Sequence, residues 1–229
     1  MIDNEHIKKN EYIKKLENVI KQMLQPLKDI PFNIVIEAMT GKKVISFDST
    51  NLDHQKVLEL LKKAALKVGK KINETGILRS RPNEVGNDVE SYVKDALNDV
   101  GLESDIPTSK NGHKKSTGYP DIIFWYNNNP YYLECKTYNI KNINTTQRSF
   151  YFSPSDEFKV IYDAPHFILS FEIYVDGEKE NKPIYKCKRY KILSIESLSV
   201  DVKYEFNSDN KRMYSGKDGT IILAEEEIE

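Results

Sequence analysis

Two strand-like segments joined by a turn constrain the fold of this chain more than any other feature. The first covers residues 121–126 and the second residues 131–137, and both are rich in aromatic and aliphatic side chains. Between them lies the turn cluster Asn127-Asn128-Asn129-Pro130. Turn residues between two such runs predict a β-hairpin.

The predicted hairpin brings two acids and a lysine together. If Tyr126 pairs with Tyr131, the register places Asp121 opposite Lys136. Because side chains alternate along a strand and paired residues point the same way, Asp121, Glu134 and Lys136 then gather on one face. A slip of one residue would separate them. The side chains expected on the opposite face, towards a packed layer, are Leu133, Cys135 and Thr137.

Two interpretations of this cluster compete. Neighbouring carboxylates in a half-buried place are unfavourable unless a positive charge lies between them. Lys136 supplies that charge if the cluster is an ordinary salt bridge. Alternatively, Asp121 and Glu134 hold a divalent cation, with Lys136 beside a water molecule. Oxygen-rich sites of this kind suit Mg²⁺, which polarises a phosphoryl group and activates water.

At these residues the chain resembles the PD-(D/E)xK nuclease superfamily. The matching positions are Pro120, Asp121, Glu134 and Lys136. The resemblance implies an α/β (mixed α+β) restriction-endonuclease-like core, in which a central mixed β-sheet is flanked by helices. It also implies Mg²⁺-dependent cleavage, with the metal held by Asp121, Glu134 and the backbone carbonyl of Cys135. The matched motif covers about twenty residues and is specific for the superfamily rather than for one member.

A third acid upstream is a further candidate ligand. Residues 83–97 carry apolar side chains at helical spacing, which predicts a helix with one buried face. Glu90 falls on the flank of that face, whereas Glu84 lies nearly opposite it. Members of the superfamily often add such a glutamate to the metal site, so Glu90 is the expected one. The alternative is a solvated Glu90 paired with Lys94 one turn later.

The rest of the chain divides into recognisable segments. The pattern predicts a helix over 7–29, a hairpin over 32–48 and a helix capped by Asn51 or Asp53. Residues 69–82 read as a basic linker broken by glycine and proline. Further strands are expected over 166–174, 184–192 and 198–206. We therefore expect an N-terminal helix-hairpin-helix addition over 1–75 and a nuclease core over 76–229, with one continuous domain as the alternative.

Composition excludes several classes of protein. The net charge of −1 is unlike that of a protein that coats nucleic acid through charge alone. No apolar run approaches the roughly twenty residues of a membrane span, and the N-terminus has no signal-peptide layout. The two cysteines form neither a disulfide framework nor a zinc site. These features predict a cytoplasmic protein without a membrane or small-molecule partner.

Two polar segments beside the hairpin are candidates for DNA contact. The loop 108–118 carries lysines, small polar residues and glycines directly before the first strand, so it suits a phosphate backbone. Residues 139–151 are rich in the amide and guanidinium side chains that read base edges. Either segment is equally compatible with an ordinary surface loop. The expected contacts are Lys110, Asn111, Lys114, Lys115, Asn144, Gln147 and Arg148.

The sequence thus favours a Mg²⁺-dependent, sequence-specific endonuclease acting on double-stranded DNA, similar to a type II restriction enzyme. The resemblance implies 5′-phosphate ends, and a palindromic target would require a homodimer with two sites. Junction resolvases and repair nucleases of the same superfamily are the nearest alternative, but they tend to be smaller and more basic. The alternative outside enzymes is a DNA-binding domain that keeps this fold without catalysis.

Overall fold

The computed structural model describes residues 2–25, 27–114, 118–139, 141, 150–151, 157–202 and 221–224, with side chains from residue 10 onward. Its contacts group the chain into two compact units. One unit combines residues 1–30 with 200–229, and the other covers residues 31–199. The second unit contains the hairpin.

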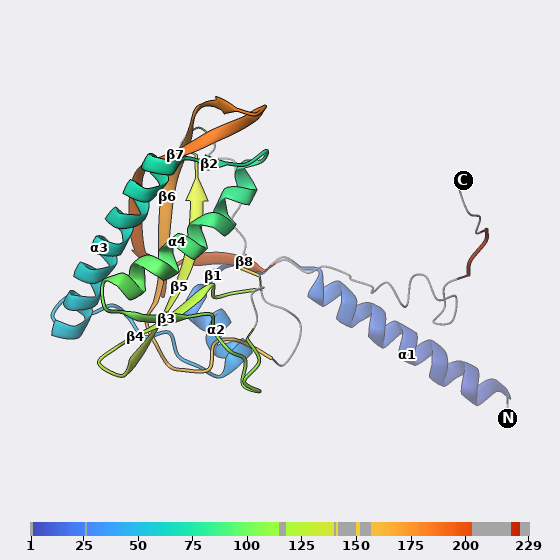
Figure 1. Ribbon diagram of the computed structural model, residues 1–229. Coiled ribbons are helices and arrows are strands. Elements are labelled where there is room, and N and C mark those ends of the chain that lie inside the picture. Colours follow the sequence, from blue (N-terminus) through green and yellow to red (C-terminus); the bar gives the residue numbers. More distant parts are fainter. Residues whose placement is uncertain are drawn as a thin grey trace. The chain divides into compact units, whose positions relative to one another are not determined.

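A mixed six-stranded sheet forms the centre of the larger unit (Figure 1). The strands follow the order β2-β7-β6-β5-β4-β3 across the sheet. β5 and β6 are parallel, and every other neighbouring pair in this sheet is antiparallel. The bounds are Ile77–Leu78 for β2, Glu103–Asp105 for β3, Ile122–Tyr126 for β4, Asn129–Tyr138 for β5, His166–Lys179 for β6 and Lys182–Ser194 for β7.

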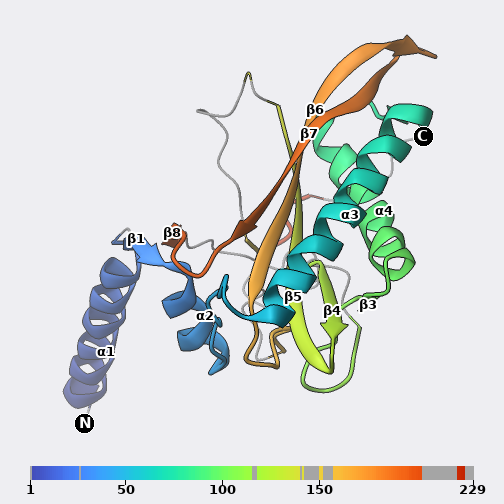
Figure 2. The ribbon, with the colours of Figure 1, turned by 90° about the vertical axis from the view of Figure 1, so that its left-hand side faces the viewer.

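Two helices cover one face of this sheet (Figure 2). α3 spans Leu52–Thr75 and α4 spans Val85–Asp99, preceded by a short 3-10 turn over Pro82–Glu84. Asn51 caps α3 as predicted, because its side chain accepts hydrogen bonds from two backbone N–H groups of the first turn. The mixed sheet flanked by helices confirms the expected α/β fold.

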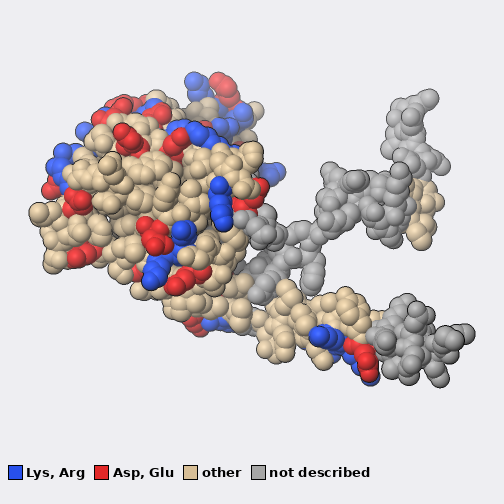
Figure 3. All heavy atoms as spheres, turned by 90° about the horizontal axis from the view of Figure 1, so that it is seen from below, with Lys and Arg blue, Asp and Glu red and all other residues tan. Residues whose placement is uncertain are grey.

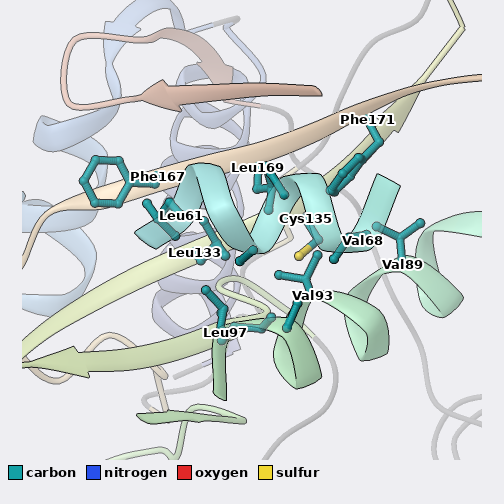
Figure 4. Close-up of a cluster of buried hydrophobic side chains, with 14 of the residues drawn as sticks. Leu61, Val68, Val89, Val93, Leu97, Leu133, Cys135, Phe167, Leu169 and Phe171 are labelled. Atoms are coloured by element: carbon teal, nitrogen blue, oxygen red, sulfur yellow. The ribbon is translucent and has the colours of Figure 1, made fainter. Parts of the chain in front are cut away.

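The hydrophobic core lies between these helices and the sheet (Figure 4). Every second residue of the central strands points into it, among them Leu133 and Cys135 of β5, as the alternation predicted. The residues of β5 that alternate with these, including Glu134 and Lys136, therefore point to the opposite face of the sheet. The labelled core residues from the helices are Leu61, Val68, Val89, Val93 and Leu97.

The hairpin forms, but with a shorter turn than predicted. Tyr126 pairs with Asn129 rather than Tyr131, so the connection has two residues instead of four. Asn127 and Asn128 both adopt positive φ, at 49° and 63°, as a type I′ turn requires. The new register differs from the expected one by an even number of positions. Each side chain therefore keeps its predicted face.

The hairpin predicted over residues 32–48 is wrong. Residues Phe32–Thr40 form helix α2, which ends at Gly41 in the left-handed conformation with φ 68°. Phe32 and Ile36 are buried one helical turn apart, so the packed positions have helical rather than strand spacing. In the second half of the predicted hairpin, Val44 makes a single parallel bridge to Ala164. A short β-branched run does not by itself distinguish a strand from a buried helix turn.

The segment 69–82, expected as a linker, belongs largely to regular structure. α3 continues to Thr75, and β2 follows directly and pairs with β7. Side chains of α3 lie in the same buried cluster as those of α4 and the sheet. The domain boundary proposed at residue 75 thus falls between two elements of one compact unit. The division into 1–75 and 76–229, like the alternative of one continuous domain, stays a prediction.

The smaller unit contains helix α1, which spans Ile2–Met23, and a two-stranded sheet of β1 (Leu27–Pro31) with β8 (Ser199–Val202). α1 ends at Met23, earlier than the predicted end at residue 29, and Leu27–Pro31 form β1 instead. Proline, which stands at position 26 of the sequence, cannot continue a helix. Its apolar stripe is exposed at Ile13, Leu16, Val19 and Met23. The strand predicted over 198–206 is present as far as Val202, and residues 203–206 lie outside the described residues.

Charged side chains of both signs are mixed over the surface seen in Figure 3. This distribution agrees with the near-neutral net charge of the whole chain. None of the described helices combines the length and the apolar character needed to cross a membrane.

Candidate active site

The structure brings Asp121, Glu134 and Lys136 together on the sheet face opposite the helices. Asp121 lies just before β4, and one of its carboxylate oxygens accepts a hydrogen bond of 2.8 Å from the backbone N–H of Cys135. Lys136 Nζ donates to Glu134 Oε1 at 2.5 Å. The cluster predicted from the hairpin therefore exists, with Asp121 next to Glu134 and Cys135 rather than opposite Lys136.

Burial makes this cluster electrostatically unfavourable for negative charge. Glu134 is only 3% exposed. Burial first, and the nearby Asp121 second, raise the pKa of Glu134 to about 7, against the lowering effect of Lys136. Burial likewise raises the pKa of Asp121, although the hydrogen bond from Cys135 opposes the shift. Two carboxylates thus share a site in which their ionised forms are poorly stabilised.

The donor groups fit a hard divalent cation. Glu134 Oε2 is buried and has no hydrogen-bond donor among the described residues. Such an oxygen is costly to bury unless a cation or a proton satisfies it. Mg²⁺ needs only one or two carboxylates and keeps several waters. Asp121, Glu134 and the Cys135 carbonyl are the groups that would hold it.

Glu90 lies on α4 within electrostatic reach of this pair. It is half-buried, whereas Glu84 is exposed, as the helical spacing predicted. Burial and the charge of Asp121 raise the pKa of Glu90 to about 7, with Lys136 and Lys159 opposing. Among the described residues, however, no three His, Cys, Asp or Glu side chains are grouped closely enough to hold a metal ion. Direct ligation by Glu90 stays a prediction.

A second lysine belongs to this site and was missed by the sequence analysis. Lys159 is 4% exposed, although it is a charged residue on a segment without regular structure. Its ammonium interacts electrostatically with Asp121, Glu134 and Glu90, while burial lowers its pKa. Lys159 comes more than twenty residues after Lys136 and belongs to no periodic pattern. Only its contacts in the folded chain identify it.

Tyr132 holds the segment that carries Lys159. Tyr132 lies two residues before Glu134 on β5, so both side chains point to the same face. Its hydroxyl accepts hydrogen bonds from the backbone N–H groups of Ile161 at 2.9 Å and Tyr162 at 3.2 Å. The strand that provides Glu134 and Lys136 therefore also fixes the position of the second lysine.

An aromatic cluster supports the approach of the chain to Asp121. The ring of Tyr119 stacks on His166, and its hydroxyl pairs with His166 Nδ1 at 2.6 Å. Phe32 of α2 packs edge-on against Tyr119 at 5.4 Å between ring centroids. Phe150 contacts the same ring and lies 5.7 Å from Lys136 Nζ. Helix α2, which the sequence analysis missed, thus braces the segment before Asp121.

The backbone conformation and close surroundings of position 118 favour glycine over any residue with a side chain. The φ of 83° at Gly118 lies in the left-handed region, and a Cβ there would approach the carbonyl oxygen of Tyr151 to 3.1 Å. The backbone N–H of Tyr119 donates to that same carbonyl at 2.8 Å. The chain therefore passes close to residue 151 immediately before the cluster of Asp121, Glu134 and Lys136.

The predicted DNA contacts are described only in part. Lys110, Asn111 and Lys114 lie on a tight turn closed by a bridge between Thr108 and Lys114. Lys114 forms a 2.6 Å ion pair with Asp105, and Asn111 donates to Glu157 at 3.3 Å. The remaining candidates lie outside the described residues; they are Lys115, Asn144, Gln147 and Arg148. Contact of any of the seven with DNA stays a prediction.

Comparison with known proteins agrees with this geometry. Residues 27–217 match the family described as the type II restriction enzyme MjaV family. The chain is also 38% identical over 233 residues to the type II restriction enzyme MjaV of Methanocaldococcus jannaschii, an alignment that covers 95% of this chain and 97% of that protein. The matched range contains Asp121, Glu134, Lys136 and Lys159. The chain therefore belongs to the MjaV family of type II restriction enzymes.

Proposed function

We propose that this protein is a Mg²⁺-dependent endonuclease that cuts double-stranded DNA within a specific sequence and leaves 5′-phosphate ends. Family membership supports the restriction-enzyme class over the junction-resolvase alternative. The observation that carries the metal-dependent part is the buried Glu134 Oε2 beside Asp121, which has no hydrogen-bond partner among the described residues. Burial disfavours the ionised form of both carboxylates there.

Asp121, Glu134 and the Cys135 carbonyl would hold the ion. When bound, Mg²⁺ supplies polarisation of the phosphoryl oxygens and lowers the pKa of a bound water. The protein's own groups do the rest. Lys136 holds the attacking water and stabilises negative charge as it develops on the phosphate. Lys159 supplies a second positive charge near the carboxylates. Glu90 is the proposed third acid.

The proposed reaction is a hydrolysis. The water oxygen adds to phosphorus, the bond between phosphorus and the 3′ oxygen breaks, and that oxygen leaves with a proton. The products are a 3′-hydroxyl and a 5′-phosphate. We propose that two copies of the chain act together, because a palindromic target presents each strand to one of two symmetry-related sites.

Plasmid cleavage tests this proposal. Wild-type protein is incubated with a set of plasmids and Mg²⁺, alongside Asp121→Asn, Lys136→Met and the exposed control Lys63→Met. We expect discrete fragments from wild type and control, and a loss of at least about 100-fold in both site variants. Sequencing of the ends reports the cut position and the phosphate. DNA binding without cutting under any divalent metal would support the inactive DNA-binding alternative and refute the proposal.

A further inference from the structure

The catalytic face of the sheet continues beyond Lys136 onto β6 and β7. The register places Lys136 beside Ser170 of β6, which pairs in turn with Lys191 of β7. Two residues further along, Tyr138 lies beside Glu172, which pairs with Arg189. Because paired residues point the same way, these side chains share the face of Glu134 and Lys136.

Side-chain contacts confirm that this second row is assembled on one face. Arg189 Nε contacts Glu172 Oε2 at 2.9 Å, and the Tyr138 hydroxyl donates to that same oxygen at 3.4 Å. Lys191 Nζ lies 5.3 Å from the centroid of the Tyr138 ring. We call Tyr138, Glu172, Arg189 and Lys191 the sheet-face cluster.

Burial within the sheet-face cluster is uneven, and this matters for its role. The Glu172 side chain is 3% exposed, whereas that of Arg189 is 57% exposed, and Lys191 is also exposed. The buried acid therefore acts as an anchor that fixes the guanidinium through Nε. Arginine has five N–H donors in a rigid fork, so an anchored guanidinium can still present donors to solvent.

We propose that Arg189 and Lys191 bind phosphates of the DNA strand that passes through the active site. This inference rests on the proposed function. The proposed catalytic centre has three carboxylates against two lysines, and the chain as a whole has no excess of positive charge to attract DNA. The positive side chains of Arg189 and Lys191 lie on the same sheet face as Lys136, two strands away, and provide local attraction. Arg189 and Lys191 are two residues apart, roughly 6.6 Å along the strand, and so offer two separate contact points.

Salt-dependent DNA binding tests the inference. A labelled mixed-sequence duplex is titrated in EDTA, which prevents cleavage, between 50 and 200 mM KCl. The double variant Arg189→Gln/Lys191→Gln is compared with wild type and with Lys62→Gln/Lys63→Gln. The control pair removes the same charge from exposed positions of α3, on the opposite side of the sheet.

We expect the sheet-face variant to bind at least about 10-fold more weakly at 100 mM KCl. Its slope of log K against log salt should be shallower by about 1 to 2, because roughly 0.9 is lost per phosphate contact. The control should keep the wild-type slope. Arg189→Lys/Lys191→Arg, which keeps both charges, should retain most of the slope and separates charge from folding.

An unchanged slope in the sheet-face variant, or an equal loss in the control, overturns the inference. The proposed function fails in a different way, since a wild type that binds DNA but never cuts it contradicts catalysis alone. Conversely, a cutting enzyme whose sheet-face variant keeps the full salt dependence refutes only the phosphate contacts.

Discussion

At the scale of single residues, the acids of the candidate active site lead us to expect a stability that depends on pH. In the folded chain, burial raises the pKa of Glu134 and of Glu90 from the ordinary value of 4.5 to about 7. The folded state therefore keeps protons that the unfolded state releases between these values. Because the folded state binds more protons in this window, stability falls as pH rises from about 4.5 to 7 and changes little above it.

This dependence leads to a prediction for Glu134→Gln. The amide cannot ionise, so in EDTA the variant should lose less stability than wild type between pH 5 and pH 8, by roughly 2 kcal/mol. Urea denaturation at the two pH values measures the difference. Mg²⁺ should stabilise wild type more at pH 8 than at pH 6, because the ligands must be deprotonated to bind it. Equal pH dependence in the two proteins would contradict the assignment.

Lys159 leads to a second prediction at this scale. Replacing it with methionine keeps the shape of the side chain but leaves Asp121, Glu134 and Glu90 with less positive charge. We expect DNA cleavage to fall at least about 10-fold and the free energy of unfolding at pH 8 to fall by about 1–3 kcal/mol. Plasmid cleavage and urea denaturation check the two effects. Lys159→Arg should recover part of the cleavage rate and part of the stability. A methionine variant that cleaves and unfolds like wild type would contradict a role for Lys159 in the site.

At the scale of elements, the hairpin turn shows how far sequence pattern specifies local structure. The turn residues and flanking apolar runs were sufficient to predict two strands. They did not fix the loop length, because Asn129 and Pro130 are turn residues that here begin β5. The faces of Asp121, Glu134 and Lys136 were nevertheless predicted correctly, since the register error was even.

Tertiary packing determined the structure where the sequence pattern alone did not predict it. Phe32 and Ile36 bury one side of a helix, with Phe32 against the ring of Tyr119, and this packing outweighs the strand preference of the β-branched run that follows Phe32. Lys159 could not be inferred at all, because its partners lie on α4 and the hairpin and are distant in sequence. By contrast, Glu90 could be separated from Glu84, since one helical period fixes which face each occupies.

The two-residue turn itself leads to a prediction. Asn128 adopts φ 63°, a conformation that glycine reaches without strain. Asn128→Gly should therefore raise the free energy of unfolding by up to about 1 kcal/mol and leave cleavage unchanged. Asn127 serves as the contrast, because its side chain donates to Asp53 at 2.9 Å and Asn127→Gly loses that bond. Urea denaturation measures both, and a destabilised Asn128→Gly would argue against the type I′ geometry.

At the scale of the whole molecule, the described residues of this 26.6 kDa chain contain one cluster of the proposed catalytic residues. If the target is palindromic, as proposed, its two antiparallel DNA strands require two chains related by a two-fold axis. In that arrangement both strands are cut in a single encounter. A monomer would instead cut one strand, dissociate and return for the other.

The two cases are distinguished by mixing subunits. Supercoiled plasmid with one target should pass directly to the linear form with wild type, with little nicked circle. When wild type is co-expressed with tagged Asp121→Asn and the hybrid dimer is purified through the tag, half of the active sites are missing but the DNA contacts remain. This hybrid should accumulate nicked circles and form linear DNA at least about 10-fold more slowly, because the second strand has no competent site in the same complex. Sedimentation should give twice the mass of the chain. If the nicked form accumulates equally with wild type, or if no hybrid can be isolated because the protein sediments as a monomer, the two-site arrangement is wrong even though each chain still cleaves DNA.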